Sequence, residues 1–378
     1  MTTSRKPARL PVAAWGLLFI VLALVVTGLV MVYSASYAFA LTEGGPYEGR
    51  PAYFFQRQAI FALGGFLSLF ILWRVDYRLY RRYAVHILVL TMLILLVMAG
   101  LGRWLVRLQT ARSVQPVELA KLGAMVYIAV WLQAKGKQIR KVNLGLIPFA
   151  LLLGVMAGLI VIQPDFSTAV VLVATATAMF FVAGADMKQL LIAFLFGGAA
   201  LVFVAMVAPY RSERIRSWLQ SPLQDVLGSG FQSIQSLAAL NKGGWLGMGL
   251  GQSQQKFAIY APHTDGMFAI IGEELGFVGA ASIICLYALW TWRGFRIALR
   301  VEDPYGMLLA VGLVSWVTLQ AVLHIAVVTA TTPFTGTVLP FVSYGGSSMM
   351  TSLASVGILL NISRVGLRPG GSAGSGRA

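Results

Sequence analysis

The sequence predicts an all-α, polytopic membrane protein with about ten transmembrane helices. Of its 378 residues, 58% are hydrophobic and only 11% are charged, and the mean hydropathy is +0.78. Ordinary soluble domains are far more polar, so this class is excluded. A hydrocarbon core about 30 Å thick requires roughly 20 apolar residues per helix. The candidate stretches are 12–34, 58–73, 84–101, 117–134, 144–162, 168–184, 189–208, 265–290, 305–329 and 345–362.

The ends of the first stretch argue against a cleaved signal peptide. Arg5, Lys6 and Arg9 precede it, but it is too long for a signal peptide and no small-residue cleavage site follows, so we expect a retained helix. Cys285 is the one cysteine of the chain, and a lone cysteine forms no intrachain disulfide.

Basic residues predict the orientation. With ten spans the termini share a side, and their side carries most of the Lys and Arg outside the long loop, for example in "RLYRR" and "KGKQIRK". Such clusters in short loops mark the cytoplasmic face, so both termini are predicted to be cytoplasmic. We interpret the net charge of +16 as anchors for membrane lipids and not as a nucleic-acid site.

The domain prediction is one integral membrane domain, 1–363, followed by a disordered cytoplasmic tail, 364–378. A large extracytoplasmic loop, 209–264, is expected between spans seven and eight. It mixes arginines and aromatic residues with "GGWLGMGLG" at 243–251. Loops of this length are usually functional or disordered, and this composition favours short amphipathic or re-entrant helices at the outer interface.

Polar residues inside apolar stretches are functional candidates, because such groups are costly in lipid. Glu118 and Lys121 are three residues apart at the start of the fourth stretch, so they share a helix face and can pair. Simple neutralisation of Lys121 explains this spacing equally well. Arg103, Arg107 and Arg112 lie just before them, where guanidinium groups bind either phosphate or lipid headgroups.

Acidic residues near the predicted outer face have structural explanations as well as functional ones. Asp165 is expected to cap the sixth helix, and Thr264 or Asp265 to cap the eighth. Glu273 and Glu274 lie two turns further in, so we expect a Lys or Arg partner, or backbone amides of a broken helix. No spacing matches a metal signature. The residues alone leave three classes open: an enzyme of lipid-linked substrates, a flippase or an ion-coupled carrier.

Five segments, in order, resemble signatures of the SEDS family (shape, elongation, division and sporulation). They are "VQPVELAKL" (114–122), "QPDFSTAVVL" (163–172), "GFQSIQSLAALNKGGWLGMGLGQSQQKF" (230–257), "HTDGMFAIIGEELGFVG" (263–279) and "TPFTGTVLPFVSYGGSSMM" (332–350). Ten spans is also the family's number. Within the family, "GMGLGQSQQKF" is more similar to the division-type branch, FtsW, than to the elongation-type branch, RodA.

The resemblance implies a peptidoglycan glycosyltransferase of the bacterial cytoplasmic membrane. Family members polymerise lipid II outside that membrane, together with a class B penicillin-binding protein, which is a transpeptidase, and other division or elongation proteins. The family's essential aspartate, in its H-T-D motif, corresponds to Asp265. Glu118 and Lys121 correspond to its Q-P-S-E-x-x-K motif. The resemblance therefore favours a catalytic Asp265 over a helix cap.

The implied chemistry is attack of a sugar hydroxyl on an anomeric carbon whose leaving group is a lipid pyrophosphate. Asp265 would be the general base, with His263 as a neighbour that tunes it. A divalent cation, Mg or Mn, is an optional aid. Other substrate-binding candidates are cations that face the pyrophosphate and polar residues of the third signature: Arg103, Lys121, Arg214, Lys256, Gln235 and Ser236.

The sequence departs from the family at several positions. "IYAPHTD" lacks the usual glutamate before the motif, and Val117, Ser167 and Gly266 replace the usual residues. A lipid II flippase is the alternative function, but it would need a polar path across the whole membrane. Most intramembrane charges lie toward the predicted outer half, which favours the enzyme. A division scaffold without catalysis would tolerate the loss of Asp265.

Overall fold

The computed structural model describes residues 12–40, 47–112, 115–163, 165–220 and 230–366, whose regular elements are helices. The α-helices are α1 (Val12–Ala40), α2 (Tyr53–Arg74), α3 (Arg78–Arg82), α4 (Ala84–Arg112), α5 (Pro116–Lys135), α6 (Leu146–Ile162), α7 (Phe166–Val182), α8 (Met187–Val207), α9 (Pro209–Leu219), α10 (Phe231–Gly243), α11 (Met267–Ala298), α12 (Pro304–Val328) and α13 (Gly346–Val365). Two short 3-10 helices are η1 (Gly136–Arg140) and η3 (Gln255–Phe257).

The helices confirm the all-α prediction and a multi-pass membrane protein. In the described part of the chain, seven helices are long and apolar enough to cross a membrane. Three shorter apolar helices, Ala84–Gly100, Leu146–Ile162 and Phe166–Val182, coincide with the third, fifth and sixth predicted stretches. Helix α13 continues to Val365, into the predicted tail, and residues 367–378 of that tail lie outside the described residues.

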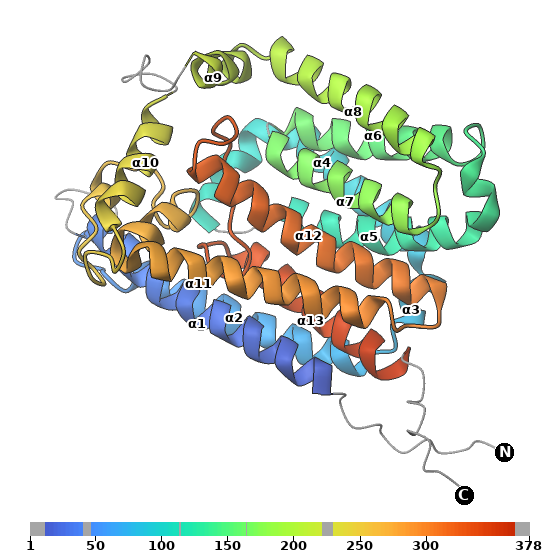
Figure 1. Ribbon diagram of the computed structural model, residues 1–378, viewed down its shortest axis with the longest axis horizontal. Helices are drawn as coiled ribbons and strands as arrows, with labels where there is room; N and C mark the ends of the chain where they lie inside the picture. The colour runs from blue at the N-terminus through green and yellow to red at the C-terminus, as the bar shows by residue number, and fades with distance from the viewer. Residues whose placement is uncertain (1–11, 41–46, 113–114, 164, 221–229, 367–378) are drawn as a thin grey trace, which may run out of the picture.

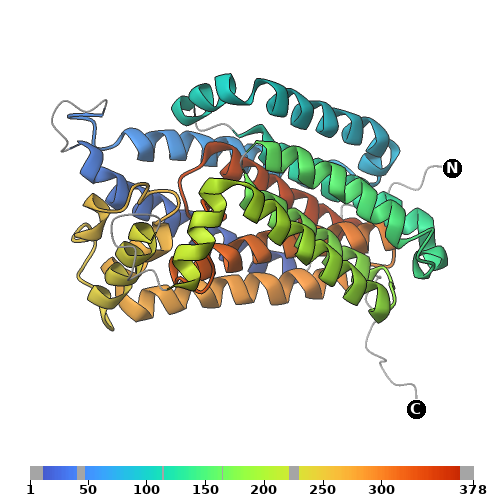
Figure 2. The same ribbon diagram turned by 90° about the horizontal axis from the view of Figure 1, so that it is seen from above.

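Helices α12 and α13 form the buried centre of the bundle. Most residues of both are buried, since α12 packs against α5, α7 and α11, and α13 packs against α2. Helix α8 lies on the outside, with few buried residues (Figures 1 and 2). The first residues of α1 and the last of α13 lie at the same end of the bundle as α3, whereas α9 and α10 lie away from it (Figure 1).

Helix starts follow local sequence signals. Pro116 and Pro304 occupy the first turns of α5 and α12, where a missing amide hydrogen costs nothing. Asp303 accepts hydrogen bonds from the first amides of α12, and Asp165 accepts one from the Thr168 amide at 3.0 Å. The predicted capping role of Asp165 is therefore confirmed.

The predicted long loop contains short helices, α9, α10 and η3. Its glycine-rich part packs against a break in α11 at Gly276, which has φ 66° and ψ −166°. A Cβ atom there would collide with the Gly247 backbone. Around the break, the amides of Met248 and Gly249 donate to the carbonyls of Glu273 and Glu274, and those of Phe277 and Val278 donate to Gly244 and Trp245.

Candidate functional site

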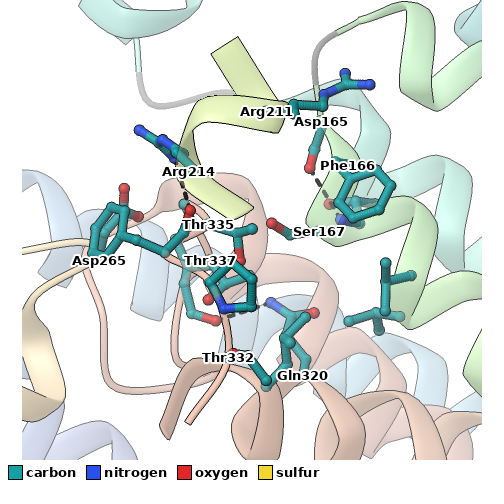
Figure 3. Close-up of a pocket in the computed structure, with 18 of the residues that line it drawn as sticks. Asp165, Phe166, Ser167, Arg211, Arg214, Asp265, Gln320, Thr332, Thr335 and Thr337 are labelled. Carbon is teal, nitrogen blue, oxygen red and sulfur yellow. Dashed lines mark hydrogen bonds between the residues drawn. The ribbon is translucent and has the colours of Figure 1, made fainter. Parts of the chain in front are cut away.

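A cavity of about 820 Å³ lies at one end of the bundle, between α9 and the starts of α5, α7 and α11. The segment that follows α12, residues 330–338, forms another part of its wall. Polar side chains from these separate elements meet there, as Figure 3 shows: Asp165, Ser167, Arg211, Arg214, Asp265, Gln320, Thr332, Thr335 and Thr337. Asp265, which the family resemblance favours as the catalytic residue, is one of them.

Asp265 is not the cap of α11. The capping position is occupied by Gly266, without a side-chain hydrogen bond to the helix, and the Thr264 hydroxyl donates to Ala261 instead. The expectation that Thr264 or Asp265 caps this helix is therefore wrong, because the helix starts one residue later than a cap at Asp265 would require. The Asp265 carboxylate instead lines the cavity, close to Gly336.

The environment of Asp265 suits proton transfer near neutral pH. Burial raises the pKa of its carboxyl from 3.8 to about 7, the cation of Arg214 opposes this rise, and the Asp165 carboxylate adds to it. A group with a pKa near 7 is present in both protonation states at neutral pH, which is the requirement for a general base.

Two arginines from α9 line the cavity. The Arg214 guanidinium donates to the Phe334 carbonyl at 2.9 Å and to the Tyr210 hydroxyl. Arg211 donates to the Val161 carbonyl at 3.0 Å. A guanidinium group has five N–H donors, and each arginine uses only some of them in these hydrogen bonds. Its other N–H groups can bind an anionic ligand. The predicted Arg103 lies in α4, but its side chain is outside the described part of the structure.

The Glu118–Lys121 pair lies in the wall between α5 and α12. The Lys121 ammonium is 2.8 Å from Glu118 Oε1 and 2.9 Å from Gln320 Oε1, and both charged side chains are buried. The cavity lining includes Glu118 and Gln320 but not Lys121. The predicted pairing is confirmed. Lys121 does not line the cavity itself, but both of its hydrogen-bond partners do.

The other predicted substrate-binding residues lie outside the cavity lining. Burial lowers the pKa of His263 to about 4, and its ring packs against both Phe54 and Tyr344. Gln235 and Ser236 lie on α10, which contributes Gln232 to the lining instead.

Lys256, also predicted to face the pyrophosphate, belongs to a buried cluster that includes Glu273 and Glu274 of α11. Its ammonium is 3.8 Å from Glu274, which also accepts from Ser34. The neighbouring Glu273 accepts from the Ser253 hydroxyl and from loop amides. The expected lysine partner is confirmed for Glu274. The alternative, amides of a broken helix, is wrong for Glu273, because the amides that it accepts from belong to the loop at 254–255.

Several cavity residues were not identified from the sequence. Gln320 is a lone amide within an apolar stretch, which is a signal that could have found it. The threonines of 332–337 lie inside a quoted family signature, but their spacing gives no reason to select them individually. Among the described residues, no group of three or more His, Cys, Asp or Glu could hold a metal ion.

The comparisons with known proteins agree with this architecture. The model of a family described as "cell cycle protein", covering FtsW, RodA and SpoVE, matches residues 15–366. Stage V sporulation protein E of Bacillus subtilis (strain 168) is 43% identical over 360 residues, which cover 92% of this chain and 96% of that protein. A probable peptidoglycan glycosyltransferase FtsW of Trichlorobacter lovleyi is 40% identical over 369 residues, which cover 95% of each chain.

Solved structures of related proteins have the same fold. A chain from a peptidoglycan synthase complex, described for its structural coordination of polymerization and crosslinking, has a TM-score of 0.72 and 29% identity. The match covers 93% of this chain and 97% of that one. The rod shape determining protein RodA of Thermus thermophilus has a TM-score of 0.65 and 26% identity, covering 93% of this chain and 96% of RodA. This chain is thus a member of the FtsW, RodA and SpoVE family of cell cycle proteins.

Proposed function

We propose that this protein is a peptidoglycan glycosyltransferase that polymerises lipid II, with Asp265 as its general base. The observation that carries the proposal is the Asp265 carboxyl, with a pKa raised to about 7, in a polar cavity that Arg211 and Arg214 also line. The names of the FtsW relatives support the reaction type, and the description of the family as a cell cycle protein supports a role in division.

The reaction requires a base and a cationic site for the leaving group. The acceptor sugar hydroxyl attacks the donor's anomeric carbon as its proton passes to Asp265. The bond from that carbon to the lipid pyrophosphate breaks, and its electron pair leaves with the pyrophosphate. Arg211 and Arg214 would stabilise the departing charge, and a single displacement inverts the anomeric centre. No step is assigned to a divalent cation.

The proposed orientation follows from the cavity and the basic loops. We propose ten membrane-crossing helices, cytoplasmic termini in a bacterial cytoplasmic membrane, and an extracytoplasmic 209–264 loop above the cavity. The partner would be a class B penicillin-binding protein, which the synthase complex supports. Other division or elongation proteins and membrane lipids complete the expected partners.

The depth of the cavity favours the enzyme over a lipid II flippase. Its lining reaches Glu118, two residues into α5, Val171 in α7 and Gln320 in α12. Gln320 is eight residues from the α12 end at Val328, or about 12 Å at 1.5 Å per residue. A transport path would have to cross a hydrocarbon core of about 30 Å.

The test is polymerisation of purified lipid II by the protein with its cognate class B partner, comparing wild type with Asp265→Asn. Asp186→Asn is a matched control, since it makes the same acid-to-amide change at the exposed start of α8, where asparagine also caps a helix. We expect glycan strands from wild type and control and none from Asp265→Asn. Equal polymerisation by Asp265→Asn would remove its role as the base. Absence of product from folded wild type would favour the flippase or a scaffold.

A further inference from the structure

The cavity wall at residues 330–338 has no regular secondary structure, so its carbonyls find partners outside a helix or sheet. Side chains from two helices provide them. From α9, Trp218 donates to Ala330 and Arg214 to Phe334, both at 2.9 Å. From α12, Gln320 and His324 bond the last two residues of the segment.

His324 and Gln320, one turn apart on α12, hold consecutive carbonyls. The His324 Nδ1 atom is 2.7 Å from the Thr337 carbonyl, and because a carbonyl oxygen accepts only, this nitrogen must carry the hydrogen. The Gln320 amide nitrogen donates to the Val338 carbonyl at 3.1 Å. Both side chains are buried, and the His324 bond is shielded from competing water.

The orientation of the Gln320 amide is set by a buried cation. Lys121 donates to Gln320 Oε1 at 2.9 Å and Trp316 donates to the same atom at 2.8 Å. Two donors at one atom require oxygen there, so the amide nitrogen is left facing Val338. Glu118, 2.8 Å from Lys121, holds the ammonium in place. The ion pair therefore fixes which end of the amide meets the wall segment.

The segment held in this way contacts Asp265. A Cβ atom on Gly336 would lie 3.0 Å from Asp265 Oδ2, so Gly336 packs directly beside the carboxylate. The charged groups that act on Asp265 in the described structure are Arg214 of α9 and Asp165 at the start of α7. Movement of Gly336 would admit water to the carboxylate and change its desolvation.

We propose that Gln320 and His324 are positioning residues, which hold residues 330–338 against Asp265, and that Lys121 acts on the reaction through Gln320. This inference rests on the proposed role of Asp265 as the base. It gives the buried Glu118–Lys121 pair a function that requires no contact between Lys121 and substrate.

The test compares Gln320→Met and His324→Phe with Thr318→Val, a matched control. Thr318 is also on α12 but bonds Thr291 of α11 and its own helix, away from the segment. For the first two variants we expect kcat to fall by about tenfold to a hundredfold, the cost of misplacing a reacting group by about 1 Å. The acid limb of the pH–rate profile should move to lower pH, because added water lowers the Asp265 pKa from about 7 toward 3.8. Thr318→Val should keep the wild-type kcat and the wild-type position of the acid limb.

Hydrogen exchange provides a readout that does not depend on polymerisation. Amides of residues 330–338 should exchange faster in Gln320→Met than in Thr318→Val. Unchanged exchange would overturn the holding role, and a fall in kcat without movement of the acid limb would overturn the link to Asp265. If folded wild type makes no polymer, the proposed function fails, whereas the exchange comparison still decides whether Gln320 holds the segment.

A double-mutant cycle tests the path from Lys121. If Lys121 acts through Gln320, Lys121→Met should lower kcat in the wild-type background and add little in the Gln320→Met background. Additive losses of kcat would overturn this part of the proposal. Thermal unfolding of each variant at the assay pH identifies any loss that arises from a smaller folded fraction.

Discussion

Replacing Asp265 with asparagine should stabilise the folded protein, and the gain should grow with pH. Burial raises the carboxyl pKa from 3.8 to about 7 despite the nearby Arg214, so the folded state binds this proton more tightly than the unfolded state does. The resulting stabilisation of wild type is fully present below pH 3.8 and is lost as the pH rises through about 7. Asparagine has no charge to desolvate, and its contribution does not titrate.

The magnitude follows from the two pKa values. One pKa unit corresponds to about 1.36 kcal/mol, so a carboxyl moved from 3.8 to about 7 costs the folded state at most about 4 kcal/mol at high pH. Part of this cost is already present at pH 5. Between pH 5 and pH 8 we therefore expect wild type to lose about 2–3 kcal/mol relative to Asp265→Asn.

The assay is thermal unfolding of the purified proteins in one detergent at pH 5, 6, 7 and 8. Asp186→Asn is the control, because Asp186 is exposed at the start of α8 and asparagine caps a helix about as well as aspartate. Its stability should stay within about 1 kcal/mol of wild type. A midpoint difference between Asp265→Asn and wild type that does not change with pH would refute the desolvation of Asp265, as would a less stable variant at pH 8.

Three further outcomes are expected. Polymerisation by wild type should rise with pH through about 7 as the Asp265 carboxyl ionises, and a flat pH–rate profile would contradict its role as the base. Gly336→Ala places a methyl group 3.0 Å from the Asp265 carboxylate and should lower kcat by about tenfold or more, measured beside the melting midpoint. Lys256→Met leaves Glu274 buried without its cation and should cost about 3–5 kcal/mol in unfolding experiments. The exposed Lys242→Met serves as its control, and equal losses from both would contradict the buried pair.

Apolar length and helix-start signals were enough to locate the helices. The stretches 117–134, 144–162 and 305–329 lie within about two residues of α5, α6 and α12, because lipid demands a minimum apolar length and proline or aspartate marks a first turn. The sequence did not indicate that α4 extends to Arg112. It raised a broken helix only as one alternative for Glu273 and Glu274, and it did not place the break at Gly276. The break depends on contacts between Gly276 and a distant loop, which no local pattern encodes.

The site was partly predictable for a related reason. Asp265, Glu118 and Arg214 stand out because charges are rare in this chain, and all three line the cavity. Lys256 stands out equally, yet it pairs with Glu274, a buried glutamate of α11. Its charge alone cannot distinguish a ligand contact from an internal ion pair. Gln320 carries no charge, and its importance depends on the three partners that converge on its amide.

The break in α11 also changes what holds the two parts of the helix together. Residues on the Asp265 side of Gly276 are joined by backbone hydrogen bonds to the glycine-rich loop at 244–249, and so are the first residues beyond it. These bonds to the loop take the place of the helical hydrogen bonds that an unbroken 32-residue helix would have at Gly276. Because the same loop is bonded to α11 before and after the break, the angle between the two parts of the helix is set by residues 244–249 as well as by the helix itself.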